Sequence, residues 1–64
     1  MSEPDAFPRS IGRPATAALL DAGYTDLAQL DGLPEAELRR MHGVGPKAVA
    51  VLRQALAERG LALT

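Results

Sequence analysis

Apolar residues recur at helical spacing in two stretches of the chain, one near each end. In the later stretch, positions 48, 51, 52, 55 and 56 are apolar, which is the pattern of one face of an α-helix. The spacing predicts the longest helix over residues 46–59, with Pro46 in its first turn and Gly60 as its stop. An earlier helix is predicted over residues 13–22, before Gly23, with an apolar face of Ala15, Ala18, Leu19 and Ala22.

Two shorter helices are predicted between these. Thr25 is suited to cap the first, over residues 26–30, whose Leu27 and Leu30 would point inward. Pro34 opens the second, which has Glu35 and Glu37 in its first turn and Leu38 and Met41 as its buried residues. β-branched residues never alternate over the length of a strand. We therefore expect a compact all-α domain of four to five helices. Its predicted core is Leu19, Leu27, Leu30, Leu38, Val44, Val51, Leu52 and Leu56.

The two long helices belong to an internal repeat. Residues 11–15, Ile-Gly-Arg-Pro-Ala, lie 33 positions before residues 44–48, Val-Gly-Pro-Lys-Ala, and Leu19 then falls on Leu52. Two helix–hairpin–helix units related by a pseudo-two-fold axis would explain this, because neither unit alone has enough apolar surface to be stable. The alternative is that alanine-rich helices align by chance.

The size of the chain allows one domain. Sixty-four residues lie near the lower limit for folding without staples, and there is no cysteine for a disulfide or a thiolate zinc site. Residues 1–8 are polar and predict a tail with Phe7 as its anchor, which leaves residues 9–64 as the domain. No apolar run approaches the roughly 18 residues of a membrane span, and the start does not resemble a signal peptide. A cytoplasmic protein without a membrane partner is expected.

Charge is unevenly distributed along the chain. The net charge is −1, yet residues 21–37 hold five acids and no base, and residues 39–53 hold four bases, His42 and no acid. Arg9 and Arg13 lie in a second acid-free stretch, residues 9–20. Both basic stretches coincide with predicted turns, so a basic end of the molecule is expected there. Uneven scatter by chance is the alternative.

The predicted turn before the last helix carries the clearest chemistry. Gly43 and Gly45 flank Val44, and Pro46 and Lys47 follow at once. The glycines allow positive φ and leave the main chain uncovered. Uncovered amides at a helix N-terminus, with its partial positive charge, favour an anion such as phosphate, and Lys47 adds a full charge. The alternative is a plain turn with a solvated lysine.

These residues resemble a known family. Residues 43–48, Gly-Val-Gly-Pro-Lys-Ala, resemble the hairpin of helix-hairpin-helix DNA-binding domains, which contact the DNA backbone through hairpin amides. The longer stretch, residues 11–63, resembles the C-terminal domain of the bacterial RNA polymerase alpha subunit. The shared features are Leu19-x-x-Ala22-Gly23-Tyr24, Leu27-x-x-Leu30, Glu35-x-x-Leu38-x-x-Met41, Gly45-x-Lys47 and Gly60-Leu61-x-Leu63. The resemblance implies a SAM-like tandem helix-hairpin-helix fold in a free-standing relative.

The resemblance also implies phosphate contact by the second hairpin, where Gly45 and Lys47 match the family pattern Gly-x-Lys-Ser. Ala48 stands at the serine position of that pattern and Ala17 at an asparagine position. Pro14 takes the place of the arginine that enters the minor groove in the family, and Arg13 lies one residue earlier.

The function expected is that of a small non-catalytic, monomeric, nucleoid-associated module that contacts the backbone of double-stranded DNA across the minor groove with little sequence preference. Its predicted DNA-binding residues are Arg9, Ile11, Gly12, Arg13, Arg40, His42, Gly43, Val44, Gly45, Lys47 and Ala48. The alternative is a protein-interaction module that docks on a polymerase, repair or recombination protein, which the acidic stretch and the lost arginine, asparagine and serine favour.

Catalytic chemistry has little to start from. The serines are Ser2 and Ser10, and His42 has neither an orienting acid nor a second ligand nearby in the sequence. No nucleotide-binding glycine loop is present. We expect no enzyme, no catalytic residue, no metal and no cofactor.

Overall fold

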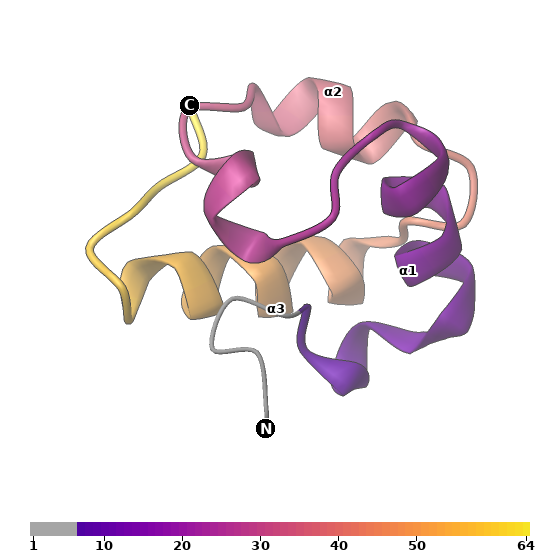
Figure 1. The fold of residues 1–64 in the computed structure, drawn as a ribbon, viewed down its shortest axis with the longest axis horizontal. Helices are drawn as coiled ribbons and strands as arrows, with labels where there is room; N and C mark the ends of the chain where they lie inside the picture. Colours follow the sequence, from indigo (N-terminus) through magenta and orange to yellow (C-terminus); the bar gives the residue numbers. More distant parts are fainter. Residues whose placement is uncertain (1–6) are drawn as a thin grey trace.

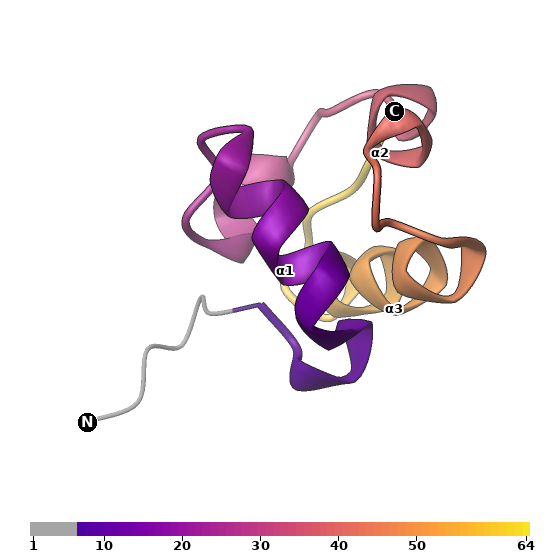
Figure 2. The same cartoon turned by 90° about the vertical axis from the view of Figure 1, so that its right-hand side faces the viewer.

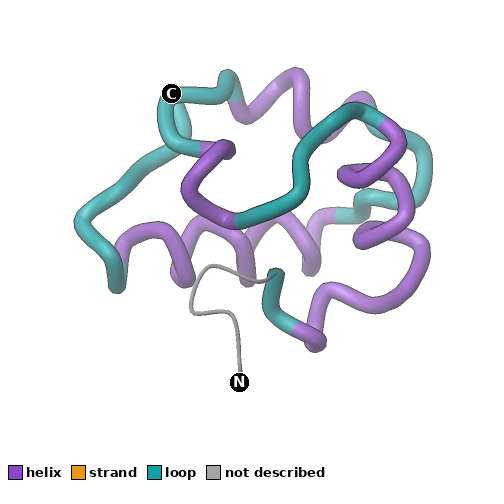
Figure 3. The backbone as a smooth tube through the Cα atoms, viewed as in Figure 1, coloured by secondary structure: helices purple, strands orange, loops and turns teal. Residues whose placement is uncertain are grey.

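The computed structural model describes residues 7–64, and this part of the chain is helical without a strand. Its α-helices are α1 (Gly12–Asp21), α2 (Glu35–Arg40) and α3 (Pro46–Ala57) (Figures 1 and 3). Two short 3-10 helices accompany them: η1 (Arg9–Ile11) precedes α1, and η2 (Leu27–Leu30) lies between α1 and α2. The predicted all-α class is confirmed. The predicted count of four to five helices is not confirmed, because the described residues form three α-helices. The segment expected as the second helix forms only one 3-10 turn, η2.

Helix α3 is the element against which the rest packs. It contacts η1, η2 and α2, and α1 lies toward its N-terminal end (Figures 1 and 2). The described residues begin beside α3, where Phe7 packs against the core as predicted. Pro8 is the N-cap of η1. Residues 1–6 of the predicted tail lie outside the described residues.

The core is aliphatic and closely follows the apolar spacing. Leu19, Leu30, Leu38, Leu52 and Leu56 are each 0 % exposed, and each contributes about 1.5–3 kcal/mol by leaving water. The predicted face of α3 was rotated by part of a turn, since Val49 is buried whereas Val51 is only half-buried. Ala22 is exposed, because α1 ends one residue before it. Met41 is half-buried and packs against the core from outside.

Helices α1 and α3 end in the same way. The amide of Gly23 donates to Leu20 and that of Tyr24 to Leu19, at 3.0 and 2.9 Å. At the end of α3, the amides of residues 60 and 61 donate to the carbonyls of residues 57 and 56, at 3.0 and 2.8 Å. Both are Schellman motifs, which satisfy the last carbonyls of a helix. The two predicted glycine stops are confirmed.

The cap of η2 is Asp26 and not Thr25. The Asp26 side chain accepts from the amide of Gln29 at 3.1 Å, and the Gln29 side chain accepts from the amide of Asp26 at 3.3 Å. This reciprocal pair is a capping box, which satisfies two donors at once where Thr25 would satisfy one.

The end of the chain lies along the loop before α2. The amide of Gly32 donates to the Ala62 carbonyl at 2.7 Å, and the Thr64 amide donates to the Leu33 carbonyl at 2.9 Å. The Asp31 carboxylate also accepts from the amide of Ala62 at 3.0 Å. These bonds hold residues 61–64 extended, so Leu61 and Leu63 cover the core as predicted.

Candidate nucleic-acid interface

Residues 41–45 join α2 to α3, and together with Pro46 and Lys47 in the first turn of α3 they form what we call the second hairpin. Gly43 has φ +94°, a conformation that residues with a side chain rarely adopt. Gly45 is extended, with φ −96° and ψ 178°, so the expectation of positive φ at both glycines is wrong for this one. Nothing lies within 4 Å of where a Cβ on Gly45 would be. Neither conformation nor internal space therefore requires glycine at position 45.

The second hairpin rests on the start of α1. A Cβ on Gly43 would lie 2.7 Å from the carbonyl oxygen of Pro14 and 3.1 Å from its carbonyl carbon. Such distances are well inside van der Waals contact, so only a glycine permits this approach. The segment of residues 9–13 that precedes Pro14, the first hairpin, consequently lies beside the second hairpin. No pattern in the sequence indicated this contact.

Several amides of the second hairpin have no partner. The amide of Val44 donates to the Met41 carbonyl at 3.1 Å, which removes it as a donor to a ligand. Within residues 7–64, the amides of Gly43, Gly45 and Lys47 donate no hydrogen bond, and no side chain caps α3. All three residues are exposed. The predicted site residue Ala48 is buried, as is Val44, so both serve the core.

The first hairpin differs in this respect. Its Ile11 amide donates to the Pro8 carbonyl at 3.3 Å, and its Gly12 amide donates to Arg9. Ile11 is also buried. Two of the three amides in the predicted turn of residues 11–13 are thus already engaged, whereas the side chains of Arg9 and Arg13 are exposed.

Charge near the hairpins is less uniform than the sequence predicts. Glu35 accepts from Arg39 at 2.8 Å and pairs with Arg53 at 3.4 Å, so two of the four bases in residues 39–53 face a carboxylate. The four-residue spacing of Glu35 and Arg39 on one helix could have predicted their ion pair from the sequence. The pair with Arg53 could not be predicted in this way, because it joins α2 to α3. Apart from Arg59, which follows α3 at its other end, the remaining bases are Arg9, Arg13, Arg40 and Lys47. These four are exposed and form no salt bridge within residues 7–64.

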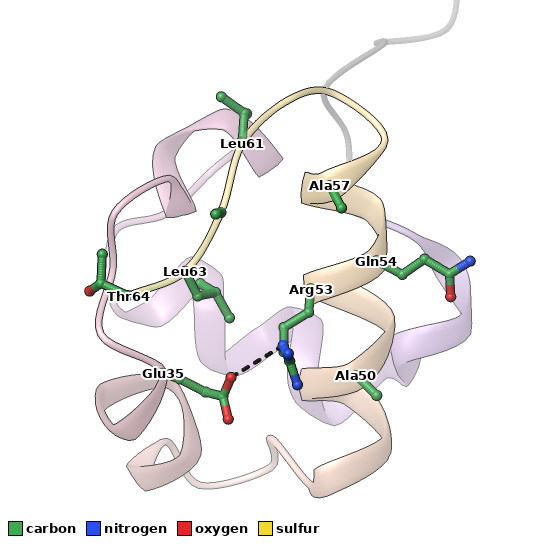
Figure 4. Close-up of a pocket in the computed structure, with 9 residues that line it drawn as sticks. Glu35, Ala50, Arg53, Gln54, Ala57, Leu61, Leu63 and Thr64 are labelled. Carbon is green, nitrogen blue, oxygen red and sulfur yellow. Dashed lines mark ion pairs between the residues drawn. The ribbon is translucent and has the colours of Figure 1, made fainter.

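A groove between α3 and the end of the chain holds the Glu35–Arg53 pair (Figure 4). Ala50, Ala57 and Leu63 also line it, and the side chain of Gln54 points away from it. Its one cation and one anion neutralise each other. It is therefore a weaker candidate for binding DNA than the second hairpin.

His42 is exposed at the second hairpin. No group of three His, Cys, Asp or Glu residues that could hold a metal occurs among residues 7–64. In the same part of the chain, no helix is long and apolar enough to cross a membrane.

Comparison of the chain with protein-family models, with curated proteins and with solved structures gave no match. The geometry of the hairpins and their charges consequently indicate the function.

Proposed function

We propose that this protein is a small non-catalytic module that binds the phosphate backbone of double-stranded DNA with little sequence preference. The observation that carries the proposal is the unpartnered set of amides at Gly43, Gly45 and Lys47, placed where α3 begins. The N-terminus of a 12-residue helix carries a partial positive charge, and the Lys47 ammonium adds to it. Phosphate oxygens satisfy both the amides and the charge.

The open space at Gly45 supports the same function. The fold does not require glycine at this position. A ligand that approaches the main chain closely would require it, because a side chain there would stand in the way. A phosphate at the N-terminus of α3 would make that approach. Arg40 and His42 lie within the same turn region and add contacts or charge.

The finer fold that we propose is a tandem pair of helix-hairpin-helix units, similar to the C-terminal domain of the bacterial RNA polymerase alpha subunit. Equivalent repeat positions share their burial: Ile11 and Val44 are 8 % and 7 % exposed, and Leu19 and Leu52 are both fully buried. The Schellman ends of α1 and α3 are a further likeness between the two halves.

Both hairpins lie on one side of the molecule, because Gly43 touches Pro14. In our proposal, the second hairpin binds phosphate through amides and Lys47, and Arg9 and Arg13 provide positive charge beside it for the opposite strand across the minor groove. Phosphate contacts hold a protein on DNA but carry no base sequence. Three or four neutralised phosphates give a salt slope of roughly −3 to −4 and a Kd no tighter than about 10⁻⁶ M at physiological salt. Such a monomer would act on nucleoid DNA.

A titration with a short DNA duplex tests the proposal. Backbone amide shifts measured at low salt are expected at Gly43, Gly45 and Lys47, and they should disappear as salt rises. Shifts confined to α2 or to residues 61–64, or an absence of shifts at low salt, would rule the second hairpin out.

A further inference from the structure

The outer face of α1 carries a groove that shares Arg9 and Arg13 with the DNA proposal and whose remaining length that proposal does not use. Arg13, Thr16, Ala17 and Leu20 line it at the spacing of one helix face, and Arg9 and Gly12 complete its end. Its volume is about 550 Å³, and its walls are more apolar than polar. Leu20 is 51 % exposed and is the one large hydrophobic residue exposed within residues 7–64.

The side-chain donors of this groove that remain for an anionic ligand are those of the two arginines. The Thr16 hydroxyl donates to the Gly12 carbonyl at 2.9 Å, and the Gly12 amide donates to Arg9. Arg9 and Arg13 form no salt bridge in the described part of the chain. Guanidinium groups bind carboxylates in a bidentate geometry, so carboxylates fit this end of the groove.

The opposite end of the groove has a different character. Leu20 and Ala17 offer apolar surface there, and Asp21 follows at the C-terminal end of α1, where a second anion would be repelled. A phosphate backbone would bring charge along the whole groove and would place it against Leu20. The groove therefore favours a ligand that is acidic at one end and apolar at the other.

We propose that this groove binds a short peptide segment of a partner protein that combines acidic residues with a large apolar residue. Positions 13 and 20 are seven residues apart on a helix, which is about 10 Å along its axis. An extended peptide covers that distance in about three residues. The recognised segment has its acids on Arg9 and Arg13 and its apolar side chain, about three residues further on, against Leu20. This site is separate from the second hairpin and does not depend on DNA binding there.

The test uses a fluorescent peptide in which two glutamates precede a leucine and a phenylalanine by three residues. Its control has serines in place of the two apolar residues. Fluorescence anisotropy is measured with the full chain, and the first peptide should bind at least about fivefold more tightly than the control, because it also buries apolar surface. Equal binding of the two peptides, or no binding, would overturn the proposal.

Variants then locate the site. Leu20→Gln should weaken the peptide about fivefold or more, and Ala17→Glu should block it by adding an anion. Ala36→Gln, at an exposed position of α2, should change nothing. Gly45→Asp should abolish duplex binding and leave peptide binding intact, so a failure of the DNA proposal is distinguished from a failure of this one. If Leu20→Gln lowered the affinity for duplex DNA and not for the peptide, the groove would belong to the DNA surface and the peptide site would be refuted.

Discussion

Gly43 lies directly against the main chain of Pro14, and no other residue type could occupy that position without moving one of the two hairpins. A Cβ added at Gly43 would lie only 2.7 Å from the Pro14 carbonyl oxygen. The contact joins positions 29 residues apart and sets the two hairpins side by side. Any ligand that bridges the hairpins depends on it.

Replacement of Gly43 by alanine should destabilise the fold more than the same change at Gly32. Both glycines have positive φ, +94° and +81°, so both variants bear a conformational cost of about 1–2 kcal/mol. Only at Gly43 does the added Cβ also meet main-chain atoms. Urea denaturation measures the difference. Equal loss of stability in Gly43→Ala and Gly32→Ala would show that the contact between Gly43 and Pro14 has room for a Cβ.

Substitutions at Gly45 should separate stability from DNA binding. An aspartate there can accept hydrogen bonds from the amides at the start of α3, so the free energy of unfolding should stay level or rise by about 0.3–1 kcal/mol. The same carboxylate would occupy the place of a phosphate, and duplex binding should be lost. Gly45→Ser is the neutral control, since it caps the helix without a charge and should weaken binding less. Unchanged duplex affinity in Gly45→Asp would contradict the phosphate site.

Lys47 should contribute more to duplex binding than a lysine or arginine elsewhere on α3. Lys47→Gln is expected to weaken binding about five- to tenfold and to reduce the salt slope by about 1, as the loss of one phosphate contact does. Arg53→Gln removes the same charge from the same helix, but Arg53 already faces Glu35 at 3.4 Å. Its effect on binding should stay within about twofold. Reversal of the charge in Lys47→Glu should abolish binding at physiological salt. Similar effects of the two glutamine variants would point to net charge and not to a site at Lys47.

Loss of the Glu35 carboxylate should strengthen DNA binding at little cost to the fold. Arg39 and Arg53 are 60 % and 62 % exposed at their side chains, and exposed ion pairs contribute about 0–1 kcal/mol. Glu35→Gln releases both arginines and should raise duplex affinity two- to fivefold at low salt, by roughly the effect of added local charge. Glu37→Gln changes net charge equally without an ion pair in the described structure to break. If both variants bind DNA equally well, release of the arginines has no separate effect.

The apolar spacing predicted the two long helices to within one or two residues at each end, because each has a sequence stop that acts locally. The buried face of α3 was harder to predict from the sequence. Val49 and Val51 are both apolar, and only the packing of η1, η2 and α2 around α3 selects Val49 for the core. The cap of η2 was misplaced for a related reason, since Asp26 gains its advantage from Gln29 three residues later.

The candidate site was predicted in outline. Gly43, Gly45 and Lys47 are exposed at the second hairpin, as the motif indicated, and whether they bind phosphate stays a prediction. The first hairpin was not distinguished from the second by its sequence. Its amides are engaged because η1 winds into α1 without a break, so Pro8 and Arg9 supply carbonyls to Ile11 and Gly12. No pattern of residue types reports that continuity.

By itself, the sequence determined the helical class, the helix stops and most of the leucine core, because propensity, capping and periodicity act over only a few neighbouring residues. The tertiary structure alone decided three features: the contact of Gly43 with Pro14, the pairing of Glu35 with Arg53, and the separation of an amide-rich hairpin from an arginine-lined groove. Each of these depends on where segments that are distant along the chain lie relative to one another. Its energy therefore depends on packing in three dimensions and leaves no local trace in the order of the residues.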